Sequence, residues 1–123
     1  MSEGQPQKIL VVDDDTSLLE VLQRAFQNAG IEVVAHSTFE GARKALHDGT
    51  FDALLTDIRL GAFNGLQLAV ISRDAHPDIR VIVFSGFDDP VLRSEAERVG
   101  AVYVVKPVTT ETLLELVRRP RTP

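Results

Sequence analysis

Four apolar runs of this chain each end at polar side chains that can take part in phosphoryl transfer. The runs and the residues that follow them are 8–12 with Asp13, Asp14 and Asp15, 53–56 with Asp57, 81–84 with Ser85, and 101–105 with Lys106. Apolar runs without alternation are typical of parallel strands covered on both faces. Because parallel strands end at one edge of a sheet, where ligands bind in open α/β folds, we expect these side chains to meet there.

The aspartates that follow the runs 8–12 and 53–56 are candidate metal ligands. Neighbouring strands lie about 4.8 Å apart, so Asp13, Asp14 and Asp57 can share one small cation. Carboxylates this close repel one another, which raises their pKa or demands a counter-ion. Mg²⁺ suits the site because it prefers oxygen ligands at about 2.0–2.1 Å. The backbone carbonyl of Arg59 is a further candidate ligand.

The polar residues at the strand ends can take separate roles in phosphoryl transfer, a reaction that depends on positioning and charge stabilisation. Asp57 is the candidate nucleophile towards phosphorus. Lys106 lies two strand spacings away, about 10 Å, and its long side chain covers much of that distance. Ser85 can donate its hydroxyl to a phosphoryl oxygen. Taken singly, an aspartate after a strand is more often a helix cap, and capping explains one of the three residues Asp13 to Asp15 but not all of them.

Strand-like and helix-like segments alternate along the whole chain, which indicates a doubly wound α/β fold of the flavodoxin-like type. The strand runs are 8–12, 31–35, 53–56, 81–84 and 101–105, each followed by a helical pattern. This (βα)5 arrangement predicts a five-stranded parallel sheet with helices on both faces. The order 2-1-3-4-5 is favoured because strand one must neighbour strand three for its acids to approach Asp57. The predicted domain covers 8–119, after a disordered extension at 1–7 and before a tail or linker start at 120–123.

Local signals place the helices. Ser37 and Glu40 have capping-box spacing at the start of the second helix. The third helix is predicted from about Gly65 to Asp74, and the fourth begins with Asp89 as its N-cap. The residues of these two helices that we expect to face the core are Leu66, Ala69, Val70, Val91, Leu92, Ala96 and Val99.

Composition excludes several classes of partner. Thirteen basic and eighteen acidic side chains give a formal charge of −5, which disfavours direct binding of nucleic acid. No apolar run approaches the ~20 residues that span a bilayer, and the first seven residues lack the apolar core of a signal peptide. The absence of cysteine fits a reducing compartment. We therefore expect a cytoplasmic protein without a membrane partner.

Taken together, these residues make the chain resemble a response regulator receiver domain of two-component signalling, in the CheY-like superfamily. The resemblance covers about Lys8 to Val117 and rests on the acid pair Asp13–Asp14, on Asp57, on Ser85 and on Lys106–Pro107. It implies that Asp57 accepts a phosphoryl group from the phosphohistidine of a sensor histidine kinase or phosphotransfer protein, with Mg²⁺ held by the acid pair. It also implies a signalling domain that catalyses only its own phosphorylation and autodephosphorylation.

The resemblance further implies a conformational switch. Ser85 moves to the phosphoryl group, Lys106 contacts it, and the ring of Tyr103 swings inward. The face built from the fourth helix, the fifth strand and the fifth helix then changes shape. The Lys106–Pro107 bond is expected to be cis, as in the family. A homodimer on phosphorylation is a further expectation, and the output domain or target stays unknown.

The chain departs from the family pattern near Asp57. Leu60 and Gly61 stand where Met-Pro is common, and glycine in place of proline predicts a looser loop. Arg59 and Phe87 occupy positions that tune dephosphorylation in the family. Both are bulky, so we expect them to hinder the attacking water and to make the phosphorylated state long-lived.

Three other functions are alternatives for a chain with this pattern. A flavodoxin-like cofactor binder needs a phosphate-cradling loop after the first strand, whereas Asp13 to Asp15 repel phosphate without a cation. A phosphatase-type hydrolase with Asp57 as nucleophile needs a substrate-enclosing cap, for which 123 residues leave no length. A receiver-like scaffold that acts only through protein–protein interaction would have lost the acids, Asp57 or the lysine, and none is lost.

Overall fold

The computed structural model describes residues 6–118, and the remainder of the predicted extension and the tail at 120–123 lie outside this range. The elements in chain order are β1 Lys8–Val12, α1 Thr16–Asn28, β2 Glu32–His36, α2 Phe39–Asp48, β3 Ala53–Asp57, β4 Arg59–Leu60, β5 Phe63–Asn64, α3 Gly65–Ala75, β6 Arg80–Ser85, α4 Pro90–Arg98, β7 Ala101–Val105 and α5 Thr110–Arg118. Strands and helices alternate as predicted, apart from the additional pair β4 and β5.

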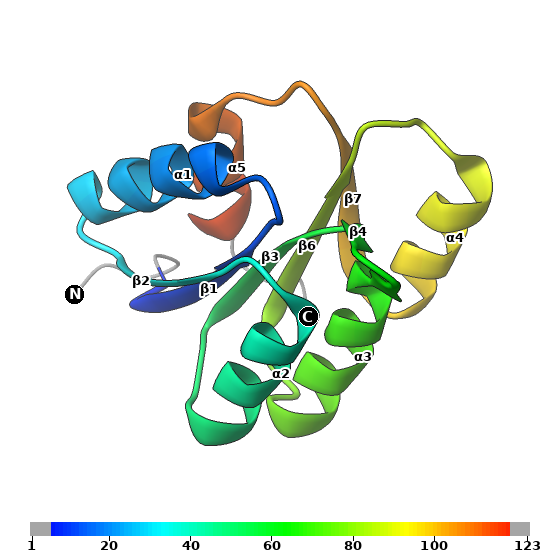
Figure 1. The fold of residues 1–123 in the computed structure, drawn as a ribbon, viewed down its shortest axis with the longest axis horizontal. Coiled ribbons are helices and arrows are strands. Elements are labelled where there is room, and N and C mark those ends of the chain that lie inside the picture. The colour runs from blue at the N-terminus through cyan, green and yellow to red at the C-terminus, as the bar shows by residue number, and fades with distance from the viewer. Residues whose placement is uncertain (1–5, 119–123) are drawn as a thin grey trace.

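Five strands form one parallel sheet in the order β2-β1-β3-β6-β7 (Figure 1). Because β6 and β7 are the fourth and fifth strands of this sheet, the predicted order 2-1-3-4-5 is confirmed. The register aligns the strand ends, with Val12 beside Thr56 and Thr56 beside Val83. The sheet therefore brings the residues that follow β1, β3, β6 and β7 to one edge.

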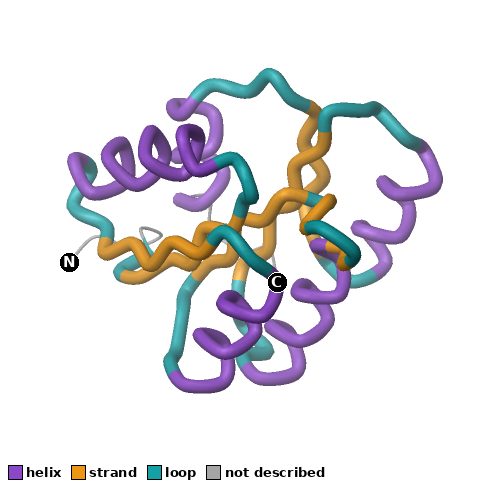
Figure 2. Tube along the Cα trace, viewed as in Figure 1, coloured by secondary structure: helices purple, strands orange, loops and turns teal. Residues whose placement is uncertain are grey.

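Helices cover both faces of the sheet (Figures 1 and 2). Successive residues of β1 face opposite sides, as a strand requires. Ile9 and Val11 pack in the cluster that includes residues of α1 and α5, whereas Leu10 and Val12 pack in the cluster that includes residues of α2, α3 and α4. All four side chains are fully buried. This two-sided burial explains why the strand runs are apolar without alternation.

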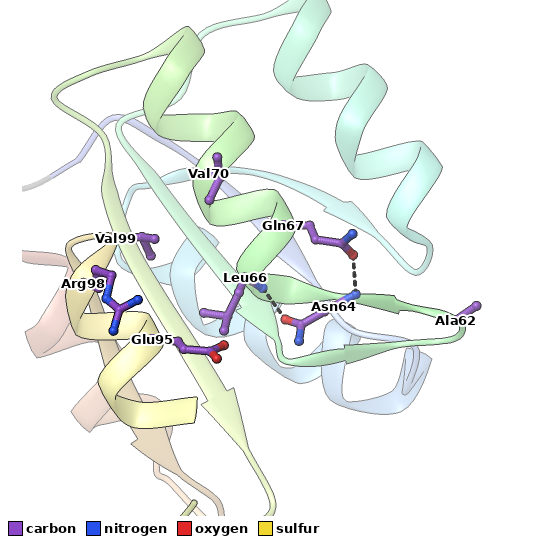
Figure 3. Close-up of a pocket in the computed structure, with 8 residues that line it drawn as sticks. All are labelled: Ala62, Asn64, Leu66, Gln67, Val70, Glu95, Arg98 and Val99. Atoms are coloured by element: carbon purple, nitrogen blue, oxygen red, sulfur yellow. Dashed lines mark hydrogen bonds between the residues drawn. The ribbon is translucent and has the colours of Figure 1, made fainter. Parts of the chain in front are cut away.

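Side-chain caps define where the helices begin. Asp15 accepts hydrogen bonds from the amides of Ser17 and Leu18 at the start of α1, and Asp89 caps α4 as predicted. A reciprocal capping box joins Asn64 and Gln67 at the start of α3 (Figure 3). Such caps satisfy amide groups that the first helical turn leaves without partners.

The structure corrects three local predictions. Thr38, not Ser37, caps α2, and its hydroxyl accepts from the amide of Gly41. Val70 and Val91, which we expected to face the core, are 53% and 65% exposed. The buried stripe of α3 includes Leu68 instead, while α4 buries only Ala96 among its residues. Helical periodicity identifies an apolar face, but the angle at which each helix lies on the sheet selects the residues that reach it.

A short β-hairpin that we did not predict follows the third strand. Residues of β4 and β5 pair antiparallel, Arg59 with Asn64 and Leu60 with Phe63. Gly61 in the turn has φ of +62°, a conformation that a proline ring cannot adopt. The segment expected to be a loose loop therefore carries backbone pairing of its own.

Two residues before β1 also contact the domain. Pro6 is buried, and the amide of Gln7 donates to the carboxylate of Asp52 over 2.8 Å.

Within residues 6–118, no helix combines the length and apolar character needed to cross a bilayer.

Candidate phosphoacceptor site

A fully buried carboxylate lies at the end of β1. The Asp13 amide donates to the carbonyl of His36, and the Asp13 carboxylate accepts from the amide of Asp15 over 2.9 Å. Burial raises the pKa of Asp13 above 3.8, and repulsion from Asp57 adds to the rise. The Asp15 amide and Lys106 act in the opposite direction without cancelling it. Removing this carboxylate from water is costly, so the site favours a compensating positive charge.

Three carboxylates converge at this edge of the sheet. Oxygens of Asp13, Asp14 and Asp57 all lie within 4.8 Å of one another. Asp14 is exposed and the other two are largely buried, so the cluster is reached from solvent on one side. An all-oxygen donor set with one carboxylate raised in pKa fits a hard divalent cation. Arg59 lies in β4, two residues after Asp57, and the part played by its carbonyl stays a prediction.

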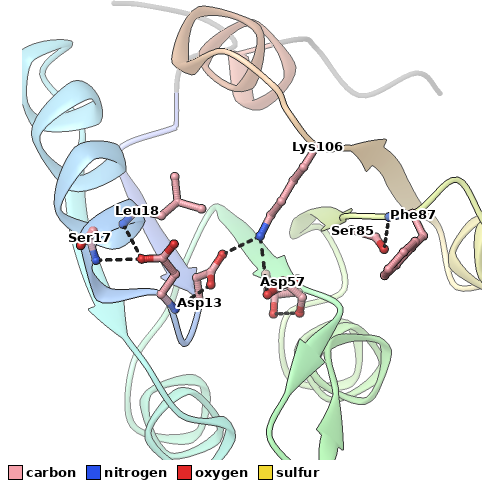
Figure 4. A network of polar contacts seen from close by, with 9 residues as sticks. Asp13, Ser17, Leu18, Asp57, Ser85, Phe87 and Lys106 are labelled. Carbon is pink, nitrogen blue, oxygen red and sulfur yellow. Dashed lines mark hydrogen bonds and ion pairs between the residues drawn. The ribbon is translucent and has the colours of Figure 1, made fainter.

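Lys106 reaches the acids from β7, the edge strand of the sheet (Figure 4). Its ammonium lies 3.2 Å from Oδ2 of Asp13 and 3.6 Å from Oδ2 of Asp57. One cation therefore contacts carboxylates from two different strands. The Lys106–Pro107 peptide bond is cis. The sequence placed these groups at strand ends, and the structure brings them together.

The backbone around Asp57 is held on two sides. The amide of Ile58 donates to the carbonyl of Phe84, and the amide of Gly65 donates to the carbonyl of Ile58 over 2.8 Å. A Cβ atom at Gly65 would overlap the backbone carbonyl of Asp57. Gly65 thus lets the start of α3 approach the nucleophile candidate closely. The sequence marks Gly65 as the start of a helix, and a glycine in the first helical turn is also a signal of close approach by another part of the backbone.

Ser85 and Tyr103 lie on neighbouring strands and both contact Phe87. The Ser85 hydroxyl accepts from the Phe87 amide over 3.2 Å, and the Tyr103 hydroxyl donates to the Phe87 carbonyl over 2.7 Å. Both side chains are buried. The guanidinium of Arg93 lies 4.8 Å from the centre of the Tyr103 ring. The structure thus describes the inward arrangement of Tyr103, and a swing on phosphorylation stays a prediction.

The two residues expected to set the phosphoryl lifetime contact each other. The guanidinium carbon of Arg59 lies 5.4 Å from the ring centre of Phe87, within the range of a cation–π interaction. Arg59 follows Asp57 by two positions and Phe87 follows Ser85 by two. Their contact therefore joins the β3–α3 segment to the β6–α4 segment beside the acids, which the sequence did not reveal.

Known proteins resemble this chain in both sequence and fold. The acid tolerance regulatory protein ActR of Sinorhizobium medicae is 35% identical over 120 residues, which are 95% of this chain and 61% of that protein. The chain thus spans about three-fifths of the length of this curated relative.

Solved structures of response regulators also resemble this chain in fold. A CheY-like response regulator receiver domain protein from Methanospirillum hungatei superposes with a TM-score of 0.87 at 27% identity, covering 91% of this chain and 90% of that one. A response regulator from Burkholderia pseudomallei, crystallised with a phosphorylated aspartic acid, a calcium ion and citrate, gives 0.85 at 28% identity, covering 90% and 66%. Residues 9–118 match the response regulator receiver domain family, and the chain belongs to that family.

Proposed function

We propose that the chain is a phosphoacceptor domain in which Asp57 takes a phosphoryl group from a sensor histidine kinase or a phosphotransfer protein. The observation that carries the proposal is the approach of one ammonium, that of Lys106, to the carboxylates of Asp13 and Asp57 at a cluster of three acids. We place this reaction in the cytoplasm and assign Mg²⁺ as its cofactor. Asp13, Asp14, Asp57 and the Arg59 carbonyl would hold the ion.

The chemistry follows from these positions. An Asp57 oxygen attacks the phosphorus of phosphohistidine, an O–P bond forms, and the N–P bond of the donor breaks. The electron pair stays on the imidazole, which takes a proton from solvent. Lys106 neutralises charge on the transferring oxygens, and the Ser85 hydroxyl, which accepts from the Phe87 amide, keeps its own proton to donate to a phosphoryl oxygen. Mg²⁺ held by these residues would supply a second positive charge that stabilises the transferring group.

The same site would remove its own phosphoryl group. Water attacks the phosphorus of the acyl phosphate, inorganic phosphate leaves, and the Asp57 carboxylate is restored. On this proposal the domain catalyses only these two reactions of its own side chain and passes the signal to an output partner. The chemistry of that partner lies outside the described residues.

Intact-mass measurement tests the phosphoacceptor assignment. Incubation with acetyl phosphate and Mg²⁺ should add one phosphoryl group to the wild type, because Asp57 is the nucleophile, and none to Asp57→Asn. Asp48→Asn, an exposed carboxylate at the end of α2, serves as the matched control and should be modified like the wild type. Equal modification of wild type and Asp57→Asn would overturn the assignment.

The Arg59–Phe87 contact supports a long-lived phosphorylated state. We expect the double variant Arg59→Ala with Phe87→Ala to lose phosphate several-fold faster than the wild type, because water then reaches the phosphorus with less hindrance. The measurement is the decay of the phosphorylated mass after acetyl phosphate is removed. Arg98→Ala, an exposed arginine at the end of α4, should decay like the wild type. A double variant that decays no faster than the wild type contradicts the hindrance.

A further inference from the structure

The β4–β5 hairpin presents two faces with different surroundings. Residues directly opposite in an antiparallel pair point to the same side, and successive residues point to opposite sides. Leu60 and Phe63 therefore share one face, and Arg59 and Asn64 share the other. Leu60 is buried in the cluster on the α2 and α3 side of the sheet. Arg59 is exposed and reaches Phe87 from the opposite face.

An aromatic stack fixes the first of these faces. The rings of Phe63 and Phe39 lie parallel, with centres 4.4 Å apart and planes inclined by 12°. Phe39 is buried in the first turn of α2, whereas Phe63 is 45% exposed. More than half of the Phe63 surface is buried, and the Phe39 ring covers part of it. The stack joins the hairpin to a helix that follows β2, a different strand of the sheet.

The far end of the hairpin is held by the helix that follows it. Asn64 and Gln67 form the capping box of α3, and Ala62 lies at the hairpin tip (Figure 3). The capping box fixes where β5 ends, but it does not set the tilt of the two-residue strands. A hairpin of this length is unstable without packing against another element. Leu60 packs β4 against the core, and the Phe39–Phe63 stack adds a contact from β5, so that both strands of the hairpin are held.

We propose that the Phe39–Phe63 stack is a positioning contact that holds Arg59 beside the phosphoacceptor. It acts on both parts of Arg59: the carbonyl, as a ligand of the cation, and the guanidinium, as a barrier to water. The inference rests on the proposed function.

The experiment compares Phe63→Ala with Phe63→Tyr, which keeps a ring for stacking, and with Val70→Ala. Val70 is a matched control because it is also an exposed apolar residue and lies on the adjoining helix α3. Calorimetric titration of each unphosphorylated protein with Mg²⁺ gives the cation affinity. Decay of the phosphorylated mass gives the lifetime, and urea denaturation gives the stability.

We expect Phe63→Ala to bind Mg²⁺ about tenfold more weakly, at the low end for residues that support a metal ligand. It should also lose phosphate faster, while Phe63→Tyr and Val70→Ala match the wild type in both measurements. In an Arg59→Ala background, Phe63→Ala should change the lifetime no further, because the two substitutions remove one shared effect.

Each result decides the proposal. Wild-type affinity and lifetime in Phe63→Ala would overturn it, as would equal losses in Val70→Ala. A large loss of stability in Phe63→Ala that Phe63→Tyr fails to restore would assign the residue to the core and also overturn it. If the wild type binds Mg²⁺ but accepts no phosphoryl group, the proposed function is wrong. The Mg²⁺ affinities of the variants then still test whether the Phe39–Phe63 stack positions the Arg59 carbonyl. If the wild type does neither, both are wrong.

Discussion

The burial of its carboxylate makes Asp13 electrostatically costly for the folded protein. Its carboxylate is fully buried beside the second carboxylate of Asp57, and one ammonium, that of Lys106, is shared between them. In the proposed function the same carboxylate is a ligand of the cation. A carboxylate at this position that serves cation binding therefore lowers the stability of the cation-free protein.

Replacing Asp13 by asparagine should stabilise the protein in the absence of divalent cations. Because burial raises the pKa of Asp13, the folded protein binds this proton more tightly than the unfolded chain. The free energy of unfolding therefore falls as the pH rises from 3.8 through the raised folded-state pKa, and this penalty persists at neutral pH. Asparagine removes the penalty, so the variant should be more stable at neutral pH and the difference should shrink towards pH 3.8.

Urea denaturation in a chelating buffer, repeated across this pH range, measures the difference. Asp74→Asn on α3 is the control, because that carboxylate is exposed and away from the acid cluster. A variant Asp13→Asn that is less stable than the wild type at neutral pH contradicts the prediction.

At the scale of the elements, the site depends on how closely α3 meets the end of β3. Helix α3 begins at Gly65 against the backbone carbonyl of Asp57, and residues 58–64, which join β3 to this contact, contain the β4–β5 hairpin. The nucleophile candidate is thus held through its backbone, while its side chain stays available for chemistry. The start of α3 is rigid enough to hold the Asp57 backbone in place, because its amides are hydrogen-bonded or capped.

Gly65→Ala should destabilise the protein by about 3 kcal/mol, the upper end for overpacking, because the added methyl group meets backbone that cannot rotate away. Gly86→Ala is the matched control, since a Cβ there would have open space around it. Chemical denaturation gives both free energies of unfolding. Equal stabilities of the two variants would show that α3 moves freely relative to β3.

For the molecule as a whole, cation binding and folding should be linked. The three acids come from β1 and β3, which are 40 or more positions apart in the chain and meet only in the folded sheet. An ion held by these groups binds the folded state and not the unfolded chain, so it adds to the free energy of unfolding.

Mg²⁺ at one hundred times its dissociation constant should raise the free energy of unfolding of the wild type by about 2.7 kcal/mol. Asp13→Asn should lose most of this gain because a buried ligand is missing. Denaturation in increasing Mg²⁺ measures the effect, with K⁺ at matched ionic strength as the control. A rise that K⁺ reproduces would indicate general screening rather than a site.

Much of the fold follows from local patterns. Apolar runs predicted the five strands of the sheet, and Asp89 with Pro90 predicted the start of α4. The strand order came from chemistry, since the acids after β1 had to approach Asp57. The exposed positions Val70 and Val91 could not be predicted, because helical periodicity does not contain the angle at which a helix crosses the sheet.

The sequence by itself determined which chemical groups stand at the strand ends. A strand buried on both faces is apolar throughout, so the first polar residues after each apolar run mark its end. Only the tertiary structure decided how those groups are used. It made Asp15 a helix cap and Asp13 the buried acid, closed Gly65 onto Asp57, and stacked Phe63 on Phe39. The burial of Asp13 and the stacking of Phe63 depend on residues distant in the chain, and no local pattern encodes such contacts.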